Sequence, residues 1–292
     1  MMGWVQKQRN KGGIIFVDMR DRSGILQVIF EDGEINKADF AKAEKLRSEF
    51  VIAVKGKVTA RSGAVNENLA TGAIELRAEE LRVLSESDTP PFPIEADSKT
   101  KEELRLKYRY LDLRRPDLQK NLIMRSKVAT LIRQFLADEG FLEIETPMLT
   151  KSTPEGARDY IVPSRKFKGK FYALPQAPQQ YKQLLMVSGF DKYFQIAPCF
   201  RDEDARADRS PGEFYQLDFE MSFATQEEVF AVGEEVLTET FAKFAPEGSV
   251  VTQAPYPIIS YKQAMLEFGS DKPDLRNPLR IIDLSDFFNK CT

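Results

Sequence analysis

The first 86 positions carry short hydrophobic runs of the kind that form β-strands. These runs cover residues 1–5, 13–17, 24–30, 50–54 and 73–78. Polar turns that contain glycine separate them, and a helical pattern over residues 39–48 follows the third run. Strands of this length and order, with a helix after the third, predict a small Greek-key barrel of the oligonucleotide-binding (OB) type over residues 1–86.

A proline-rich stretch follows this region. The segment Thr89-Pro90-Pro91-Phe92-Pro93 favours extended chain over regular structure. We therefore expect a linker over residues 87–103 and a second domain over residues 104–292.

The second domain mixes helices and strands without a regular alternation. Apolar residues recur at three- and four-residue steps from Leu118 to Leu136, which predicts a long amphipathic helix that ends at Gly140. Further helices are predicted over 179–187 and 226–244, and strands over 141–147, 169–174, 193–196 and 213–223. This order favours an α+β fold with a largely antiparallel sheet.

Composition narrows the chemistry. The chain has no histidine and only two cysteines, Cys199 and Cys291, far apart in sequence. Histidine-based catalytic triads and zinc sites are therefore excluded, and a disulfide framework is not expected. The cysteines fit a reducing cytoplasm, and no apolar run is long enough to predict a membrane span or a signal peptide.

Charge is uneven along the chain. The formal net charge is −3, yet residues 101–134 hold ten Lys and Arg against four acidic residues. Such a segment either attracts phosphates or forms a solvated helix face. Neither a P-loop nor a Gly-x-Gly-x-x-Gly word occurs, so any nucleotide would be held by charge rather than by a glycine cradle.

One segment concentrates charge more than any other. Residues 200–209 hold three arginines and four acidic residues, and the predicted strand after them carries Asp218 and Glu220. Side chains alternate along a strand, so these two carboxylates share one face. An arginine such as Arg201 suits a phosphate. The alternative to a phosphate site is a surface hairpin with many ion pairs, and composition does not decide between the two.

Several sequence motifs together resemble those of the bacterial-type aspartyl-tRNA synthetases, which are class II enzymes. Phe141–Pro147 resembles motif 1 of that class, and Phe200–Glu203 resembles the Phe-Arg-x-Glu of motif 2. Residues 108–116, 153–160 and 269–276 resemble the aspartyl enzymes in particular. The resemblance covers essentially the whole chain and implies an aspartate–tRNA ligase that uses ATP, Mg²⁺ and L-aspartate.

The resemblance implies three sets of site residues. Arg201 would clamp the α-phosphate of ATP and act in catalysis, with Asp202, Glu203 and Phe214 completing the ATP site. The implied aspartate-binding residues are Glu155, Gln176, Gln179, Lys182 and Asp218. Ala177 stands where many relatives have serine, so one hydroxyl contact is lost or replaced.

The implied anticodon-binding residues are Arg9, Asn10, Phe16 and Gln27. Without the resemblance, Phe16 would be read as ordinary core packing. Asn10 and Lys11 differ from the residues often found at these positions, and this loop bears on whether tRNA(Asn) is charged in addition to tRNA(Asp). A cytoplasmic homodimer with no membrane contact is implied as well.

The glycine-rich motif 3 of the class does not occur before Thr292. Its arginine and the main Mg²⁺ ligands are expected beyond residue 292, so we expect a truncated chain that is inactive alone. Two other functions stay open: a non-catalytic tRNA-binding fragment, and a sister asparaginyl- or lysyl-tRNA synthetase.

Overall fold

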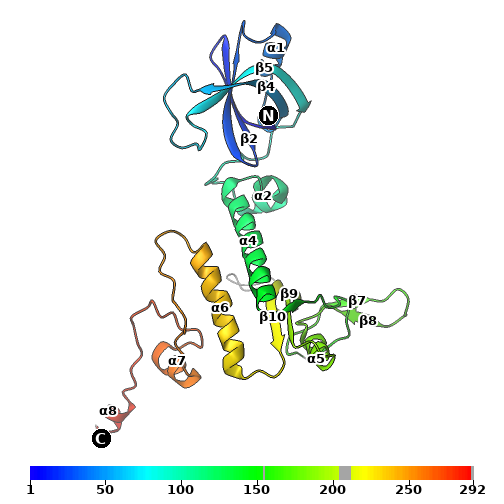
Figure 1. Cartoon of the computed structure of the whole chain (residues 1–292), viewed down its shortest axis with the longest axis vertical. Coiled ribbons are helices and arrows are strands. Elements are labelled where there is room, and N and C mark those ends of the chain that lie inside the picture. The colour runs from blue at the N-terminus through cyan, green and yellow to red at the C-terminus, as the bar shows by residue number, and fades with distance from the viewer. Residues whose placement is uncertain (154, 204–211, 291–292) are drawn as a thin grey trace. The chain divides into compact units, whose positions relative to one another are not determined.

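The computed structural model describes residues 1–153, 155–203 and 212–290 (Figure 1). The chain forms two compact units, Met1–Leu122 and Ile123–Thr292. Asp204 and the other charged positions up to Arg209, which the sequence analysis singled out, lie outside the described residues.

The first unit contains a closed five-stranded barrel with the strand order β1-β2-β3-β5-β4. Its elements are β1 (Met2–Asn10), β2 (Ile14–Asp21), β3 (Gly24–Glu31), α1 (Lys37–Glu44), β4 (Val51–Ala60) and β5 (Ile74–Ser85). Neighbouring strands are antiparallel except β3 and β5, which pair in parallel. The predicted OB-type barrel, with a helix after its third strand, is confirmed.

Alternation along β2 decides which side chains build the barrel core. Ile15, Val17 and Met19 are fully buried in that core. Phe16 and Asp18 lie between them on the opposite face and are only half-buried. Ordinary core packing therefore does not describe Phe16, and its ring is available on the outer face of the barrel.

The proline-rich stretch has no helix or strand, as predicted, but it is packed. Phe92 and Ile94 are buried, and the Gln6 side chain donates a hydrogen bond of 2.6 Å to the Ile94 carbonyl. This stretch is therefore fixed against the barrel rather than a loose tether.

Two short helices follow, α2 (Glu102–Lys107) and α3 (Arg109–Asp112). The long helix α4 (Pro116–Asp138) comes next. The sequence analysis missed α2 and α3. Asp112 is fully buried and pairs with Arg109 at 2.9 Å and Arg115 at 3.2 Å. Part of the basic segment 101–134 is therefore used within the fold, where its arginines surround a buried carboxylate, whereas most of its other lysines and arginines are exposed, as expected of a solvated helix face.

A second buried carboxylate ties this segment to the barrel. Glu49 lies 2.8 Å from Arg20 of β2 and 2.6 Å from Arg114. The guanidinium groups of both arginines also lie against the Trp4 ring, at 5.9 and 5.3 Å from its centroid. Strand, helical segment and tryptophan therefore meet at one buried ion-pair cluster.

The second unit is built on the hairpin of β9 (Lys192–Phe200) and β10 (Glu213–Met221), which pair antiparallel. The short β6 (Leu142–Glu143) pairs with β9 in parallel. A separate hairpin joins β7 (Ile161–Pro163) and β8 (Phe171–Ala173), and the remaining helices are α5 (Gln179–Val187), α6 (Gln226–Phe244), α7 (Tyr261–Phe268) and α8 (Ser285–Asn289).

The predicted helices over 179–187 and 226–244 agree with α5 and α6. The strand predicted over 141–147 is wrong in extent, because only Leu142 and Glu143 pair with β9. Beyond Ile144 the chain leaves β9, and Pro147 has no N–H with which to continue a ladder. The strand β7 and the helices α7 and α8 were not predicted.

The Glu49 cluster gives a test of what holds the barrel to its flanking segment. The side chain of Glu49 is 2% exposed and that of Arg20 is 9% exposed. Glu49→Gln leaves Arg20 buried without a counter-charge, and we expect it to lower the free energy of unfolding by roughly 3 kcal/mol. The measurement is urea unfolding followed by fluorescence of Trp4, the only tryptophan of the chain.

The matched control is Glu79→Gln, since Glu79 and Lys57 form an exposed pair on the barrel surface. That change is expected to cost less than about 1 kcal/mol. Equal effects of the two substitutions would contradict a stabilising role for the buried cluster.

Candidate functional site

The β9–β10 hairpin has one apolar face and one polar face. Phe194 of β9 and Leu217 and Phe219 of β10 pack into the core of the second unit. The register pairs Gln195 with Asp218 and Tyr193 with Glu220, which places these four on the other face. The prediction that Asp218 and Glu220 share a face is confirmed.

Lys182 of α5 reaches across to both carboxylates. Its Nζ lies 2.9 Å from Asp218 Oδ1 and 3.2 Å from Glu220 Oε2. Burial lowers the pKa of Lys182, but the hydrogen bond and charge of Asp218, followed by those of Glu220, raise it above its ordinary value overall. The ammonium group therefore stays charged and neutralises only one of the two carboxylates.

Asp218 keeps one acceptor free. It is 5% exposed, and its Oδ2 is buried without a hydrogen-bond partner among the described residues. Burial raises the pKa of Asp218 above its ordinary value in spite of Lys182. A buried, unpaired carboxylate oxygen is costly unless something donates to it, and an ammonium group is a suitable donor.

Buried polar side chains support Asp218 on the same face. Tyr193 Oη and Thr146 Oγ1 lie 2.9 and 3.0 Å from Gln195 Oε1. Burial, with the nearby Asp218, raises the pKa of Tyr193, and burial raises that of Cys199 to about 11. Both groups stay protonated at neutral pH, so the face offers fixed polar contacts rather than a nucleophile.

Arg201 and Phe214 lie together at the end of the hairpin where β9 leads into β10. The Arg201 guanidinium stands 4.9 Å from the centroid of the Phe214 ring, and the Arg201 N–H donates to the Gly212 carbonyl at 2.8 Å. Gly212 has φ +96°, and a Cβ there would come within 2.7 Å of the Tyr160 hydroxyl. A glycine is required for this approach, and it brings two of the four predicted ATP residues together.

The loop around Glu155 is fastened from two sides. Gln176 is 1% exposed, and its Nε2 donates to the Ala157 carbonyl at 2.9 Å and to Asp159 at 2.6 Å. Arg158 Nε donates to the Asp202 carbonyl at 3.0 Å. Gln176 therefore holds a loop in place, and its amide is already used by the protein.

Three predicted residues are not drawn into these contacts. Glu155, Gln179 and Glu203 are exposed, and Asp202 contributes its backbone to Arg158 while its side chain is exposed. The structure thus assembles Lys182 with Asp218 and Arg201 with Phe214, and leaves the other predicted residues at the margin.

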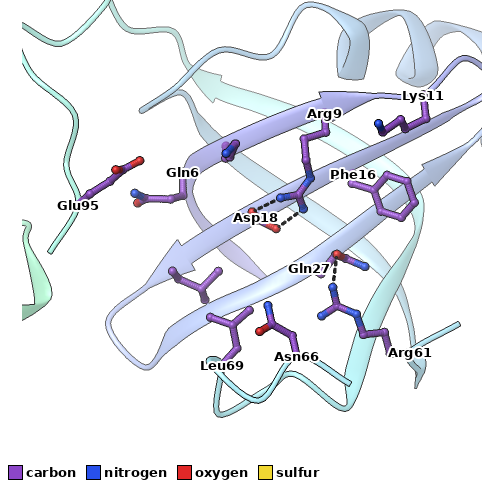
Figure 2. Close-up of a pocket in the computed structure, with 12 residues that line it drawn as sticks. Gln6, Arg9, Lys11, Phe16, Asp18, Gln27, Arg61, Asn66, Leu69 and Glu95 are labelled. Carbon is purple, nitrogen blue, oxygen red and sulfur yellow. Dashed lines mark hydrogen bonds and ion pairs between the residues drawn. The ribbon is translucent and has the colours of Figure 1, made fainter. Parts of the chain in front are cut away.

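A pocket of about 470 Å³ lies on the barrel, and Figure 2 shows the residues that line it. Three of the four predicted anticodon residues line it: Arg9, Phe16 and Gln27. Arg9 forms a two-point ion pair with Asp18 at 2.7 and 2.9 Å. The fourth, Asn10, is not among the lining residues, and its side chain instead accepts a hydrogen bond from the Gly12 N–H at 2.9 Å.

The floor of this pocket is a polar chain. Gln27 is buried, accepts from Arg61 Nη2 at 2.9 Å and donates to the fully buried Glu75 at 3.2 Å. Arg61 Nη1 is buried without a partner among the described residues. A half-buried aromatic ring beside amide and guanidinium donors suits an unpaired base, which stacks and accepts hydrogen bonds.

The sequence analysis missed Asp18, Arg61 and Asn66 in this pocket. Asp18 had a usable signal, since it alternates with core residues along the same strand as Phe16. Arg61 and Asn66 lie in the irregular stretch between β4 and β5, where no periodicity places a side chain.

The small barrel with its pocket and the sheet that bears the Arg201–Phe214 and Lys182–Asp218 pairs fit a class II aminoacyl-tRNA synthetase. Residues 101–290 match the family model described as tRNA synthetases class II (D, K and N), and the chain belongs to this family. Residues 1–84 match the OB-fold nucleic acid binding domain, an anticodon-binding family.

Curated relatives agree along the whole chain. It is 65% identical to the aspartate–tRNA(Asp/Asn) ligase of Lachnoclostridium phytofermentans over 100% of its length and 48% of that protein. It is 58% identical to the aspartate–tRNA ligase of Agathobacter rectalis over the same shares. The chain thus spans about half the length of the curated relatives it matches.

Solved structures resemble the fold at lower identity. The asparaginyl-tRNA synthetase of Pyrococcus horikoshii, complexed with asparaginyl-adenylate, superposes with a TM-score of 0.77 at 26% identity, over 91% of this chain and 62% of that one. A putative aspartyl-tRNA synthetase of Leishmania major gives 0.75 at 26% identity, over 84% and 49%.

Two features of the described residues bear on other functions. No three carboxylate, cysteine or histidine side chains among them come close enough to hold a metal ion. Within the same part of the chain, no helix has the length and apolar character needed to cross a membrane.

The Lys182–Asp218 pair predicts a pH-dependent stability effect. Lys182→Met leaves Asp218 buried without its cation, and we expect a loss of about 3 kcal/mol in the free energy of unfolding at pH 7. Protonated Asp218 needs no counter-charge, so the difference from the parent chain should shrink as the pH falls toward 5.

Urea unfolding at pH 7 and pH 5, followed by circular dichroism, measures this difference. Arg133→Met removes a cation from a largely exposed pair with Glu143 and serves as the control, with an expected effect below about 1 kcal/mol at both values. A Lys182→Met deficit that grows on acidification would refute this account of the pair.

Proposed function

We propose that the protein of which this sequence forms at least part is an aspartate–tRNA ligase. The observation that carries the proposal is the half-buried Lys182 held between Asp218 and Glu220 on the polar face that also bears Arg201 and Phe214. The names and identities of the curated relatives support aspartate as the amino acid.

In the proposed reaction the α-carboxylate of aspartate attacks the α-phosphorus of ATP, and pyrophosphate leaves. The tRNA 3′ end then takes the aspartyl group. No protein nucleophile is needed, because the substrate carboxylate supplies the electrons. Placement and neutralisation of the charge on the phosphorus oxygens supply the rate, and Arg201 is the group suited to the second task.

Substrate recognition follows from the charges on the polar face. The free Oδ2 of Asp218 accepts from the α-ammonium group, and Lys182 pairs with the side-chain carboxylate of the substrate. The α-ammonium group and the side-chain carboxylate of the substrate then each meet an opposite charge. Phe214 stacks on the adenine, with Asp202 and Glu203 at its edge, while Glu155 and Gln179 complete the aspartate site and Gln176 holds the loop that bears Glu155.

Mg²⁺ accompanies ATP in this proposal. The described residues offer no cluster that fits it.

We propose tRNA(Asp) as the nucleic-acid partner, recognised at the barrel by Arg9, Asn10, Phe16 and Gln27. We retain the division into an anticodon-binding domain over residues 1–86, a linker over 87–103 and a catalytic domain over 104–292. The boundary between the two compact units lies later in the chain, at Leu122. Residues 104–122 are therefore assigned to the catalytic domain, although they pack with the barrel. A homodimer in the cytoplasm completes the proposal.

Amino-acid activation tests the ligase directly. The assay is exchange of labelled pyrophosphate into ATP, catalysed by the protein encoded by the whole gene. Exchange should depend on aspartate and drop at least about a hundredfold on Arg201→Lys, because a point charge replaces a two-pronged donor. Exchange supported equally by asparagine or lysine would reject the aspartyl assignment and favour a sister enzyme.

A non-catalytic tRNA-binding protein is the second candidate, and the pocket on the barrel favours it independently of the catalytic unit. Binding of tRNA(Asp) without aspartate-dependent exchange would select it. The same binding assay with tRNA(Asn) tests the wider specificity named for one of the relatives.

Phe16→Ala tests the pocket on the barrel. Loss of one stacked base is worth about 1–3 kcal/mol, so tRNA(Asp) should bind roughly 5- to 150-fold more weakly. Filter binding measures the dissociation constant, and Phe40→Ala would not serve as a control because Phe40 packs on the barrel core. Val58→Ala is suitable, since Val58 is 62% exposed on the same barrel and does not line the pocket.

A further inference from the structure

The β7–β8 hairpin carries a compact, ordered loop over residues 164–170, and Figure 1 shows it extending beyond the two strands. The Ser164 N–H donates to the Lys170 carbonyl at 3.0 Å, and the Lys170 N–H donates to the Phe167 carbonyl at 3.1 Å. Ser164 Oγ accepts from the Phe167 N–H at 3.1 Å, and Gly169 has φ +73°. These contacts hold the loop in one shape.

The loop is strongly basic in a chain whose net charge is −3. Residues 161–173 contain no acidic side chain and four basic ones, all exposed: Arg165, Lys166, Lys168 and Lys170. None of the four forms an ion pair with another residue in the described part of the chain. Their charge is therefore directed to the solvent without local compensation.

This state differs from that of the arginines around Asp112 and Glu49. Arg109, Arg114 and Arg115 near α4 are each bound to a buried carboxylate, and their charge is used within the fold. The loop over 164–170 also presents an aromatic side chain, since Phe167 is 49% exposed with Lys166 Nζ at 5.5 Å from its ring centroid. Unpaired cations around an exposed ring suit a nucleic-acid strand, which offers phosphates and flat bases.

The hairpin is joined directly to the catalytic site. Ala173, the last residue of β8, exchanges backbone hydrogen bonds of 2.9 Å with Thr150, and the Leu174 N–H donates to the Tyr160 carbonyl at 2.9 Å. Two residues later comes Gln176, which fastens the loop that bears Glu155. A strand bound at the basic loop would thus lie on the unit that holds Arg201 and Lys182.

We propose that the basic loop over residues 164–170 binds the phosphate backbone of the tRNA acceptor stem, apart from the base-reading pocket on the barrel. The inference rests on the proposed function, because aminoacylation requires the 3′ end to enter the site next to which this hairpin is anchored. Lys and Arg contacts to phosphates are independent of sequence, so the loop positions the RNA and the barrel selects it.

The test compares Lys166→Gln/Lys168→Gln with the control Lys262→Gln/Lys272→Gln. Both pairs are exposed lysines of the second unit, and both variants lose two charges. Binding of tRNA(Asp) is measured by fluorescence anisotropy at about 50 to 200 mM NaCl, the range over which the affinity of phosphate-driven binding falls steeply. The loop variant should bind about tenfold or more weakly at the low-salt end, with the log–log salt slope reduced by about two.

A second pair of ligands separates the two binding sites. The loop variant should bind an RNA hairpin with the acceptor-stem sequence more weakly than the parent chain does. Phe16→Ala should bind the same hairpin as tightly as the parent chain does. An anticodon stem-loop should behave in the opposite way. The control variant should bind each RNA within about twofold of the parent chain.

Equal affinity and salt slope for the parent and the loop variant would overturn this inference while leaving the ligase proposal intact. The loop variant could keep its affinity for tRNA(Asp) but bind anionic vesicles or an acidic peptide more weakly than the parent chain does. That outcome would assign the loop to another partner and overturn the inference too. Failure of the parent chain to bind tRNA(Asp) would overturn the inference, whereas aspartate-dependent exchange would still support the ligase. A loop variant whose thermal unfolding matches the parent excludes misfolding as the cause.

Discussion

The two-residue alternation of the β9–β10 hairpin is the constraint on which the second unit depends. Phe194, Leu217 and Phe219 must face the core, and the antiparallel register then forces Gln195 and Asp218 onto the other face. A slip of one residue would bury carboxylates in the core and expose the aromatic rings. The apolar half of the hairpin therefore fixes the polar half, and the binding chemistry is placed by the same hydrophobic burial that stabilises the fold.

Buried charge is handled in two different ways in this chain. Glu49 and Asp112 are each surrounded by arginines, so their charge is satisfied within the fold. Asp218 shares its single lysine with Glu220 and keeps one oxygen unpaired. A site made for stability would have matched these charges. The excess negative charge beside Lys182 is what a zwitterionic ligand with an ammonium group would complete.

Periodic patterns predicted the parts of the fold that burial alone decides. The barrel strands, α5 and α6 follow from alternation or from three- and four-residue steps, and the shared face of Asp218 and Glu220 follows from period two. The packed linker, the Glu49 cluster and the lining residue Arg61 could not be predicted that way. Each depends on contacts between positions distant in sequence, such as Gln6 with Ile94, that no local pattern encodes. The resemblance gave Gln176 a role in binding aspartate. In the structure, the amide of Gln176 forms hydrogen bonds with the loop that contains Ala157 and Asp159.

The same reasoning separates basic residues that hold the protein together from those available to a ligand. Counting charges ranks residues 101–134 as the basic region, yet four of its ten cations pair with Asp112, Asp117 or Glu49. The shorter run at 164–170 has fewer cations but no acidic residue within the hairpin. A phosphate backbone competes with internal carboxylates for each cation, and it meets no such competition at this loop. The loop over residues 164–170 is therefore suited to RNA because none of its cations is used within the fold, whereas part of the longer segment is.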